Sequence, residues 1–347
     1  MSHPATTGAT VPARGPLRPR RPLLPDGAID ADDLRKSYSG GRGQAPVTAL
    51  DGLSLRIRAG EVFGLLGPNG AGKSTTVKIL ATLARPDSGQ ASVAGHDVLR
   101  DPWAVRAAIG LVSQRPSSAP LMTGRESIEL AGRSQGMSRR DSARRAAELL
   151  DRFGLADAAD RLTRTCGGGM ARKLDVAVGL AHRPTVLFLD EPTTGLDPQA
   201  WAEMWAEIAR MTAEDQMTVL LTTHYLDEAD HLADRLAIID HGRVVVQGTP
   251  EDLKSELQGD GVVVELVEPS DGPGALRLLS GMSEVRQPSA QGRTLRARAD
   301  SGARAVPAVL LALDEAHITV LTGTVTRPSL DDVYLRHVGC AFEEASR

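Results

Sequence analysis

Short apolar runs, separated by glycine-containing turns and helical stretches, dominate the first two-thirds of the chain. Leu53–Arg58 alternates strictly between apolar and polar residues, which predicts a half-buried strand. Glu61–Leu66 is mostly apolar and ends in a glycine-rich turn, after which Ser74–Leu83 has helical spacing. Three more strands are expected, separated by helical stretches: Val186–Leu189, Val219–Thr222 and Leu236–Ile239. This alternation predicts a mainly parallel sheet with helices packed on it.

A different pattern begins near residue 250. A helix is predicted from there to Leu257, and residues 259–261 (Gly-Asp-Gly) end it. Six elements then follow in the order strand, helix, strand, strand, helix, strand: Val262–Val267, Gly274–Leu279, Ser283–Arg286, Arg293–Ala299, Ala303–Ala316 and Ile318–Val325. This is the order of a split βαβ unit, so the pattern predicts a small second domain, with a last helix over Ser329–Val338.

Composition narrows the classes of function. The 347 residues are enough for two domains, and 41% hydrophobic content is enough for a buried core. A net charge of −4 and only 3% aromatic residues argue against a surface that binds nucleic acid. No run approaches the roughly 18 apolar residues of a membrane span, and no apolar secretory signal is recognisable. The two cysteines, Cys166 and Cys340, indicate no disulfide framework, which suits a reducing cytosol.

Residues 1–27 differ from the rest in being rich in Pro and Arg. We expect a disordered tail, because closely spaced prolines prevent regular structure. Its basic side chains leave open a weak attraction to anionic lipid headgroups, worth about 1 kcal/mol for each residue near the surface. These side chains are Arg14, Arg18, Arg20 and Arg21.

The strongest chemical signal lies between an apolar strand and a helix. Nine residues match the pattern G-x-x-x-x-G-K-[ST] completely: Gly67, Pro68, Asn69, Gly70, Ala71, Gly72, Lys73, Ser74 and Thr75. The glycines let backbone N–H groups surround phosphates, and the start of the helix adds partial positive charge. We expect Lys73 to reach the β- and γ-phosphates and the Ser74 hydroxyl to coordinate Mg²⁺.

Two carboxylates complete this predicted site. Asp190 ends the apolar run 185–189, where a carboxylate can hold Mg²⁺ directly or through water. Glu191 follows and is placed to orient or deprotonate an attacking water. Downstream of a phosphate-binding loop, this pair predicts Mg²⁺-dependent nucleotide binding and hydrolysis.

Residues 190–198 (Asp-Glu-Pro-Thr-Thr-Gly-Leu-Asp-Pro) resemble the Walker B and D-loop segment of ABC ATPases, and Asp197 lies in the D-loop part. The resemblance covers roughly residues 29–250 and implies further roles. Gln114 resembles the Q-loop glutamine, which contacts Mg²⁺ and the lytic water and faces a membrane partner. His224 resembles the switch histidine that contacts the γ-phosphate. Tyr38 stands where the family places an aromatic ring on adenine.

The segment that resembles the family's signature motif departs from it. Gly167 occupies the position of the family's serine, whereas Gly168 and Gly169 retain the glycine pair. One hydroxyl donor to a charged phosphate is missing, and such a bond is worth about 1.5–3 kcal/mol. We therefore hypothesise normal ATP binding with slower hydrolysis. Two alternatives stay open: a mixed dimer whose other chain supplies an intact signature, and simple tolerance of glycine.

A closer resemblance, to the daunorubicin-resistance branch, rests on Pro328–Tyr334 and on residues 162–170. It implies the fold class: an α/β P-loop NTPase domain over 28–250 with a helical subdomain at about 115–183, plus a small α+β domain over 251–347. It also implies a subunit with ATP and Mg²⁺ as cofactors that works as a homodimer on the cytoplasmic face of the cell membrane. There it would power export of a drug-like or hydrophobic compound through a separate integral membrane permease.

Two rival functions remain open at this stage. A soluble ABC ATPase acting on ribosomes or DNA is disfavoured by the single nucleotide-binding unit and the absence of a basic surface signal. A regulatory ATP sensor is disfavoured by Glu191 and His224 but favoured slightly by Gly167. The second domain contains no recognisable catalytic residues, and we expect it to stabilise the dimer or to regulate access.

Overall fold

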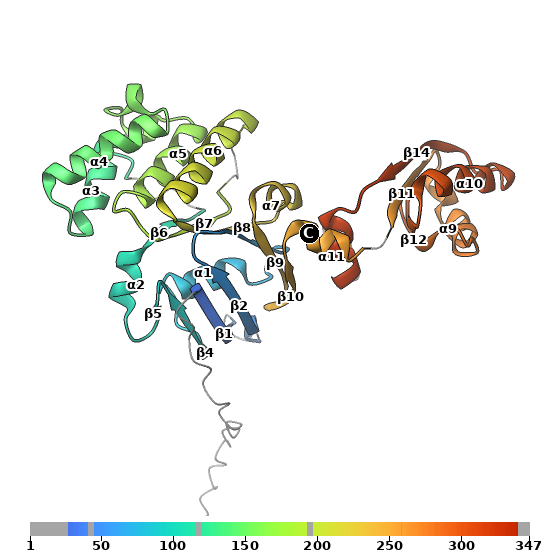
Figure 1. Cartoon of the computed structure of the whole chain (residues 1–347), viewed down its shortest axis with the longest axis horizontal. Coiled ribbons are helices and arrows are strands. Elements are labelled where there is room, and N and C mark those ends of the chain that lie inside the picture. Colours follow the sequence, from blue (N-terminus) through green and yellow to red (C-terminus); the bar gives the residue numbers. More distant parts are fainter. Residues whose placement is uncertain (1–26, 41–44, 115–118, 193–196, 258, 339–347) are drawn as a thin grey trace, which may run out of the picture.

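The computed structural model describes residues 27–40, 45–114, 119–192, 197–257 and 259–338. The expected tail and Cys340 therefore lie outside the described residues, apart from Gly27. Within the described ranges the chain forms three sheets, two of them in the part that precedes residue 250 and one beyond it. Figure 1 shows the first two sheets beneath a group of helices, and the third standing apart.

The central sheet has six strands in the order β10-β9-β3-β8-β7-β6. Its strands are β3 (Val62–Leu66), β6 (Ile109–Val112), β7 (Val186–Asp190), β8 (Thr218–Thr223), β9 (Arg235–Asp240) and β10 (Arg243–Gly248). All neighbours are parallel except β10, which is antiparallel to β9. Strands β3, β7 and β8 are buried throughout, as their continuous apolar runs require when both faces of a sheet are covered. The predicted parallel sheet is confirmed.

A second, antiparallel sheet covers one side of this core. It has the order β2-β1-β4-β5 and is formed by β1 (Gly27–Tyr38), β2 (Val47–Arg58), β4 (Ser88–Val93) and β5 (His96–Asp97). Helix α1 (Lys73–Leu80) packs between the two sheets, because Val77 and Leu80 share one apolar cluster with Leu53 of β2 and Phe188 of β7. Helix α2 (Pro102–Ala108) leads into β6.

Helices cover the opposite face of the central sheet. They are α3 (Gly124–Ser134), α4 (Arg139–Arg152), α5 (Gly168–Gly179) and α6 (Pro198–Asp215), with short 3-10 turns at Ala156–Ala158 and Thr163–Thr165. Thr123 and Glu126 form a reciprocal capping box that starts α3. Leu149 and Leu174 pack in one cluster with Leu187 of the sheet. The helical character predicted for this region is confirmed.

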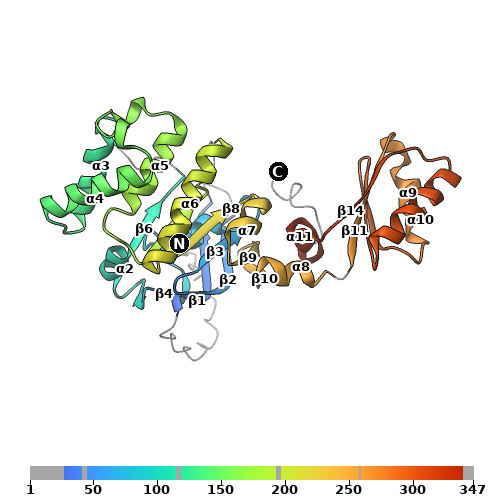
Figure 2. The same cartoon turned by 45° about the horizontal axis from the view of Figure 1, so that its top comes forward.

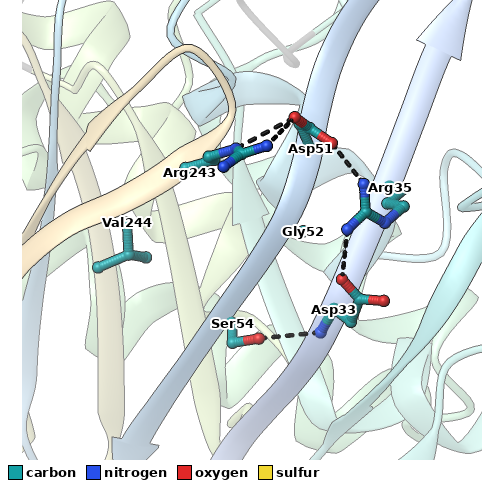
Figure 3. A pocket seen from close by; sticks show the side chains of 7 residues that line it. All are labelled: Asp33, Arg35, Asp51, Gly52, Ser54, Arg243 and Val244. Atoms are coloured by element: carbon teal, nitrogen blue, oxygen red, sulfur yellow. Dashed lines mark hydrogen bonds and ion pairs between the residues drawn. The ribbon is translucent and has the colours of Figure 1, made fainter. Parts of the chain in front are cut away.

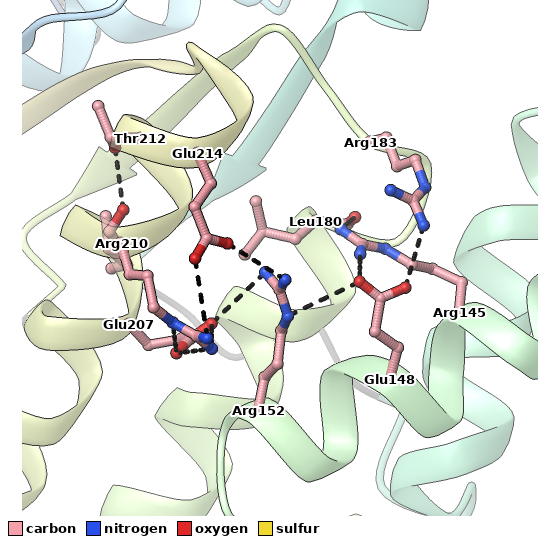
Figure 4. A network of polar contacts seen from close by, with 10 residues as sticks. Arg145, Glu148, Arg152, Leu180, Arg183, Glu207, Arg210, Thr212 and Glu214 are labelled. Carbon is pink, nitrogen blue, oxygen red and sulfur yellow. Dashed lines mark hydrogen bonds and ion pairs between the residues drawn. The ribbon is translucent and has the colours of Figure 1, made fainter.

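A network of ion pairs fixes α4 to its neighbours (Figure 4). Glu148 accepts hydrogen bonds from Arg145 at 2.5 Å and from Arg183 at 3.0 Å. Arg145 is buried, and it also donates to the carbonyl oxygen of Leu180 at 3.2 Å. Arg152 extends the network toward α6 through contacts with Glu207 and Glu214. The network therefore ties α4 to the connection between α5 and β7 and to α6.

Helices from both sides of residue 250 pack together in an apolar cluster that is separate from the clusters on the two faces of the central sheet. Helices α7 (Leu226–Leu232), α8 (Pro250–Ser255) and α11 (Leu330–Val338) contribute to it. Leu253 of α8 and the fully buried Tyr334 of α11 pack with Leu226 and with Leu236 of β9. Helix α11, the last one within the described ranges, therefore packs on the first part of the molecule.

The segment between α8 and α11 has a core of its own. It forms β11 (Asp260–Leu266), a 3-10 turn (Pro269–Asp271), α9 (Gly272–Ser280), β12 (Arg286–Gln291), β13 (Thr294–Ala299), α10 (Gly302–Glu315) and β14 (Val320–Thr326). Its antiparallel sheet has the order β12-β13-β11-β14, and its apolar cluster contains only residues of this segment. Figure 2 shows the sheet with α9 and α10 on one face. The predicted β-α-β-β-α-β order is confirmed.

One predicted strand of this segment is wrong in position. A strand was expected over Ser283–Arg286, but β12 runs from Arg286 to Gln291. The sequence of β12 is polar and contains Pro288, so it has no apolar alternation to reveal it. Val285 is buried because it packs into the cluster beneath the sheet, not because it lies in a strand. A polar edge strand with a proline is typical of a position that pairs on one side only.

Candidate active site

The phosphate-binding loop connects β3 to α1, in the strand–loop–helix context that the sequence predicts. Gly72 has φ of +111°, and a Cβ built on it would lie 2.6 Å from the carbonyl oxygen of Ala49. A Cβ on Gly67 would lie 2.4 Å from the carbonyl oxygen of Ile239. Such distances exclude any side chain, so both positions require glycine. The loop is thereby held against β2 and β9, with the first N–H groups of α1 at its end.

Lys73 is the first residue of α1, and only 4% of its side chain is exposed. Its Nζ donates to the carbonyl oxygens of Gly67 at 2.6 Å and Pro68 at 3.1 Å. Nζ also lies 3.7 Å from Oε1 of Glu191. Burial lowers the pKa of Lys73, and the carboxylates of Glu191 and Asp190 oppose this shift. The loop thus holds a buried cationic group, which has the charge that phosphate oxygens attract.

Ser74 and Asp190 meet where α1 approaches the end of β7. The hydroxyl of Ser74 donates to Oδ1 of Asp190 at 3.2 Å, and the hydroxyl of Thr222 donates to the same oxygen at 2.6 Å. Hydroxyl and carboxylate oxygens are the ligands that Mg²⁺ prefers, so Ser74 and Asp190 fit a magnesium site. No group of three or more His, Cys, Asp or Glu in the described ranges is placed to hold a metal ion. Phosphate and water oxygens would therefore complete the coordination.

Glu191 follows β7 and lies opposite His224, which follows the neighbouring β8. Oε1 of Glu191 is 3.4 Å from Nδ1 of His224. The backbone of Glu191 has φ of +48°, a left-handed conformation that costs on the order of 1–3 kcal/mol in a residue with a Cβ. Its N–H donates to both the hydroxyl and the carbonyl oxygen of Thr222, at 3.1 and 3.2 Å. These bonds hold Glu191 where its carboxylate lies between Lys73 and His224.

Gln114 and Tyr38 lie at the margin of this group. Gln114 is exposed and follows β6, whose last residue, Val112, pairs with Leu189 just before Asp190. Tyr38 ends β1, is 40% exposed, and lies beneath Nζ of Lys36 at 5.4 Å from the ring centre. Among the described residues, neither side chain hydrogen bonds to the phosphate loop, and the roles that the resemblance implies for them stay predictions.

The segment that resembles the family's signature motif lies at the start of α5. Gly167 is the N-cap residue, with φ of −66° and ψ of 163°, and Gly168 and Gly169 begin the helix. In the part of the chain that the structure describes, no hydrogen bond or ion pair joins these glycines to the phosphate loop. Asp197 caps α6 by accepting a hydrogen bond from the N–H of Ala200 at 2.8 Å. The residues between Glu191 and Asp197 that belong to the D-loop resemblance, 193–196, lie outside the described residues.

Two residues that sequence reasoning did not select are central to the site. Thr222 bonds to both Asp190 and Glu191, and Arg172 of α5 bonds to the backbone around them. Thr222 pairs with Asp190 in the parallel register of β7 and β8, a relation that depends on the sheet. Arg172 is a charged residue at a buried position of a helix, and such residues are rarely buried without partners. This could have marked Arg172 as a candidate.

A cavity of about 300 Å³ lies elsewhere, between β1, β2 and β10 (Figure 3). Asp33 and Asp51 both bind Arg35, and Arg243 also binds Asp51. The bond from Arg243 keeps the pKa of Asp51 below its ordinary value. None of the residues that line this cavity belongs to the phosphate loop or to the carboxylate pair. Its charges neutralise one another, so we place the nucleotide site at the loop.

Comparison with known proteins identifies the class to which this fold and site belong. A family model described as "ABC transporter" matches residues 50–194. A second, "ATP-binding protein DrrA1-3-like, C-terminal domain", matches residues 248–338. Many solved structures are similar to about two-thirds of the chain, and two of them illustrate the likeness. The first is cbiO1 of Clostridium perfringens (TM-score 0.60, 28% identity, 67% of this chain and 92% of that chain). The second is the dimeric cassette MJ0796 in a post-hydrolysis state with ADP and Pi (TM-score 0.59, 26% identity, covering 64% of this chain and 98% of that chain). The fold is thus that of ABC ATP-binding cassettes.

Relatives match nearly the whole chain. The daunorubicin/doxorubicin resistance ATP-binding protein DrrA of Streptomyces peucetius is 45% identical over 93% of this chain and 96% of its own length. The doxorubicin resistance ATP-binding protein DrrA of Mycobacterium tuberculosis is 40% identical over 89% and 93%. The linearmycin resistance ATP-binding protein LnrL of Bacillus subtilis is 32% identical over 90% and 98%. This chain belongs to the family of ABC transporter ATP-binding proteins that includes these drug-resistance proteins.

Helix length and hydropathy add one further finding. None of the helices in the described ranges has the length and apolar character needed to cross a membrane.

Proposed function

We propose that this chain is the Mg-ATP-hydrolysing subunit of an ABC exporter for a drug-like or hydrophobic compound. The observation that carries the proposal is the group formed by Lys73, Glu191 and His224 beside the Ser74–Asp190 pair. It combines a buried cation for phosphate, two oxygen ligands for Mg²⁺ and a carboxylate that can accept a proton from water. Relatives named for drug resistance support the class of exported compound.

Each residue of this group has a distinct role in the proposed reaction. Lys73 and the first N–H groups of α1 bind and orient the phosphates. Bound Mg²⁺, held by Ser74 and Asp190, would supply charge stabilisation to the transferred phosphoryl group. Glu191 orients the attacking water and accepts its proton. His224 lies next to the same carboxylate, where it would contact the γ-phosphate. Positioning and charge stabilisation are the main sources of rate in this chemistry.

The active form in this proposal is a homodimer on the cytoplasmic face of the membrane. The phosphate loop and the glycines 167–169 are not joined by bonds among the described residues of one chain, which supports a site completed by a second copy. Closure of the two copies on ATP would then move a separate membrane permease through the region of Gln114. A mixed dimer, in which another chain supplies a serine-bearing signature, remains the second candidate because of Gly167.

In this proposal the small segment 260–326 stabilises the homodimer, because the edge strand β14 pairs with β14 of the second copy. This edge strand contains neither proline nor a charged residue, the devices that usually block pairing at a sheet edge. Leu321 and Val325 are 57% and 47% exposed on it. If two copies pair antiparallel about Gly323, Leu321 of each lies opposite Val325 of the other. Two apolar cross-strand pairs would then lose their contact with water.

The experiment that tests the hydrolytic function measures Mg-ATP turnover by the chain in membranes with its permease. Glu191→Gln is the blank, because glutamine keeps the shape of the side chain but cannot accept the proton. We expect the variant to bind ATP and to lose at least about 100-fold in turnover, the lower end of the range for general base catalysis. Wild-type turnover no higher than the blank, with ATP bound, would reject hydrolysis and favour the sensor function.

A further inference from the structure

Arg172 and Asp175 are the two buried charged residues of α5, and Arg172 reaches the backbone of the active site. It lies five residues after Gly167, and only 8% of its surface is exposed. Burial lowers the pKa of its guanidinium, opposed by the carboxylates of Asp175 and Asp190. A guanidinium in this position would be costly without partners, since buried charges are stable only when they are hydrogen-bonded.

The partners of Arg172 are backbone carbonyl groups of two separate segments. Nη1 donates to Ser113 at 2.6 Å, directly before Gln114. Nη2 donates to Asp190 at 3.2 Å and Glu191 at 3.1 Å, and Nε donates to Pro192 at 2.8 Å. One side chain therefore bonds to the end of β6 and to three consecutive residues at the end of β7.

The geometry of this contact requires arginine. A guanidinium is planar and carries five N–H donors in a rigid fork, so it can reach acceptors on two sides at once. A lysine ammonium has three donors at a single point and cannot span Ser113 and Pro192 together. The four carbonyl groups belong to strand ends, where the regular sheet bonding stops and buried acceptors need other donors.

We propose that Arg172 is a positioning residue. It couples helix α5, which begins at Gly168, to the backbone before Gln114 and to the catalytic Glu191. Helix α5 begins at the glycines that the second copy's nucleotide would contact, and Arg172 is fixed to that helix. Any shift of α5 is thus passed directly to the backbone that carries Asp190 and Glu191 and to the residue before Gln114. The expected effect on turnover rests on the proposed function. The hydrogen bonds by which Arg172 joins α5 to the two segments do not depend on it.

The test compares Arg172→Lys with Lys173→Gln in the full chain with its permease. Lys173 is the next residue of the same helix, and it pairs with Glu203 of α6 at 2.6 Å, so it serves as the matched control. We expect Arg172→Lys to lower kcat at least about 10-fold, since more than one charge-assisted bond is lost. We expect the Kd for ATP, measured with magnesium, to stay within about threefold, because Lys73 and the loop are untouched. The control should change neither quantity.

Amide hydrogen exchange gives a second readout that does not depend on turnover. Arg172→Lys should raise exchange in both 109–114 and 186–192, and leave 124–152 unchanged, whereas the control should alter neither segment. Unchanged kcat, loss of ATP binding in parallel with kcat, or faster exchange confined to α5 would each overturn the coupling. If wild-type turnover equals that of Glu191→Gln, the proposed function fails while the exchange data still decide whether Arg172 links the two segments.

Discussion

At the scale of single residues, the site is organised by side chains that hold backbone in place. Thr222 keeps Glu191 in a left-handed conformation, and Asp190 receives the hydroxyl hydrogens of both Ser74 and Thr222. Gly167 is different, because nothing lies within 4 Å of a Cβ built on it. Its φ and ψ are also those of an ordinary N-cap, a position that serine prefers. Glycine is therefore not required by the fold at position 167.

Gly167→Ser should consequently raise turnover at saturating ATP. In the proposed homodimer the added hydroxyl would donate to the γ-phosphate of the partner site, a bond worth about 1.5–3 kcal/mol, or roughly 10- to 150-fold in rate. Gly167→Ala is the matched control, because it adds the Cβ in the same open space without the hydroxyl. Equal turnover in the serine variant, the alanine variant and the wild type would show that glycine is simply tolerated.

At the scale of elements, packing and ion pairs decide how the helices sit on the sheet. Helix α4 meets the rest of the molecule through an apolar stripe and through the network around Arg145 and Glu148. Arg145 has 3% of its side chain exposed and has only Glu148 and the carbonyl of Leu180 as hydrogen-bonding partners among the described residues. The carboxylate of Glu148 is therefore the compensating charge for a buried guanidinium.

Glu148→Ala should lower the free energy of unfolding by about 1.5–3 kcal/mol, because it removes the carboxylate that hydrogen bonds to the buried Arg145. Urea unfolding followed by circular dichroism measures this change. Glu214→Ala is the control in the same network: its carboxylate is 48% exposed and pairs with Arg152 at 3.4 Å. Exposed pairs contribute about 0–1 kcal/mol. Equal losses for the two variants would contradict the role assigned to burial.

At the scale of the whole molecule, the C-terminal helix α11 packs against the part of the chain that precedes the segment 260–326. The segment 260–326 has its own apolar cluster, but α11 beyond it packs with α7, α8 and β9. Gly261 and Thr326 face each other in the pairing of β11 with β14, so the segment leaves and rejoins at neighbouring points. The segment 260–326 therefore lies between two helices, α8 and α11, that pack together with α7 and β9.

Removal of the small domain should depend on how it is done. Deletion of 261–326 with a short Gly-Ser linker should leave a chain that folds and binds ATP, because α8 and α11 keep their contacts. Truncation after Gly259 should be destabilised by at least about 2–5 kcal/mol more, since it removes Tyr334 and Val333 from a core. Thermal unfolding of both chains measures the difference. Equal stability would refute the shared core, and an undiminished dimer in the deletion variant would remove the role proposed for β14.

Much of this protein was determined by its sequence alone, because the chemistry of a phosphate-binding loop is local. Residues 67–75 are contiguous, and the bonds of Lys73 to Gly67 and Pro68 stay within that loop. Strands β3, β7, β8 and β9 were likewise predictable, since each is a short apolar run of the kind that is covered on both faces of a sheet. Strands β6 and β10 of the same sheet were not among the predicted strands. The order of elements in the small domain followed from the same periodicity, with the polar strand β12 as the exception.

Only the tertiary structure decided which distant residues support the site. Thr222 meets Asp190 and Glu191 through the register of β7 and β8, and no local pattern fixes a parallel register. Arg172 reaches Ser113 and Pro192 because α5 packs against the ends of two strands. The packing of α11 against α7, α8 and β9 depends equally on contacts between residues far apart in the sequence. Local sequence encodes an element and its reactive groups, whereas the partner of a buried charge is set by the folding of the whole chain.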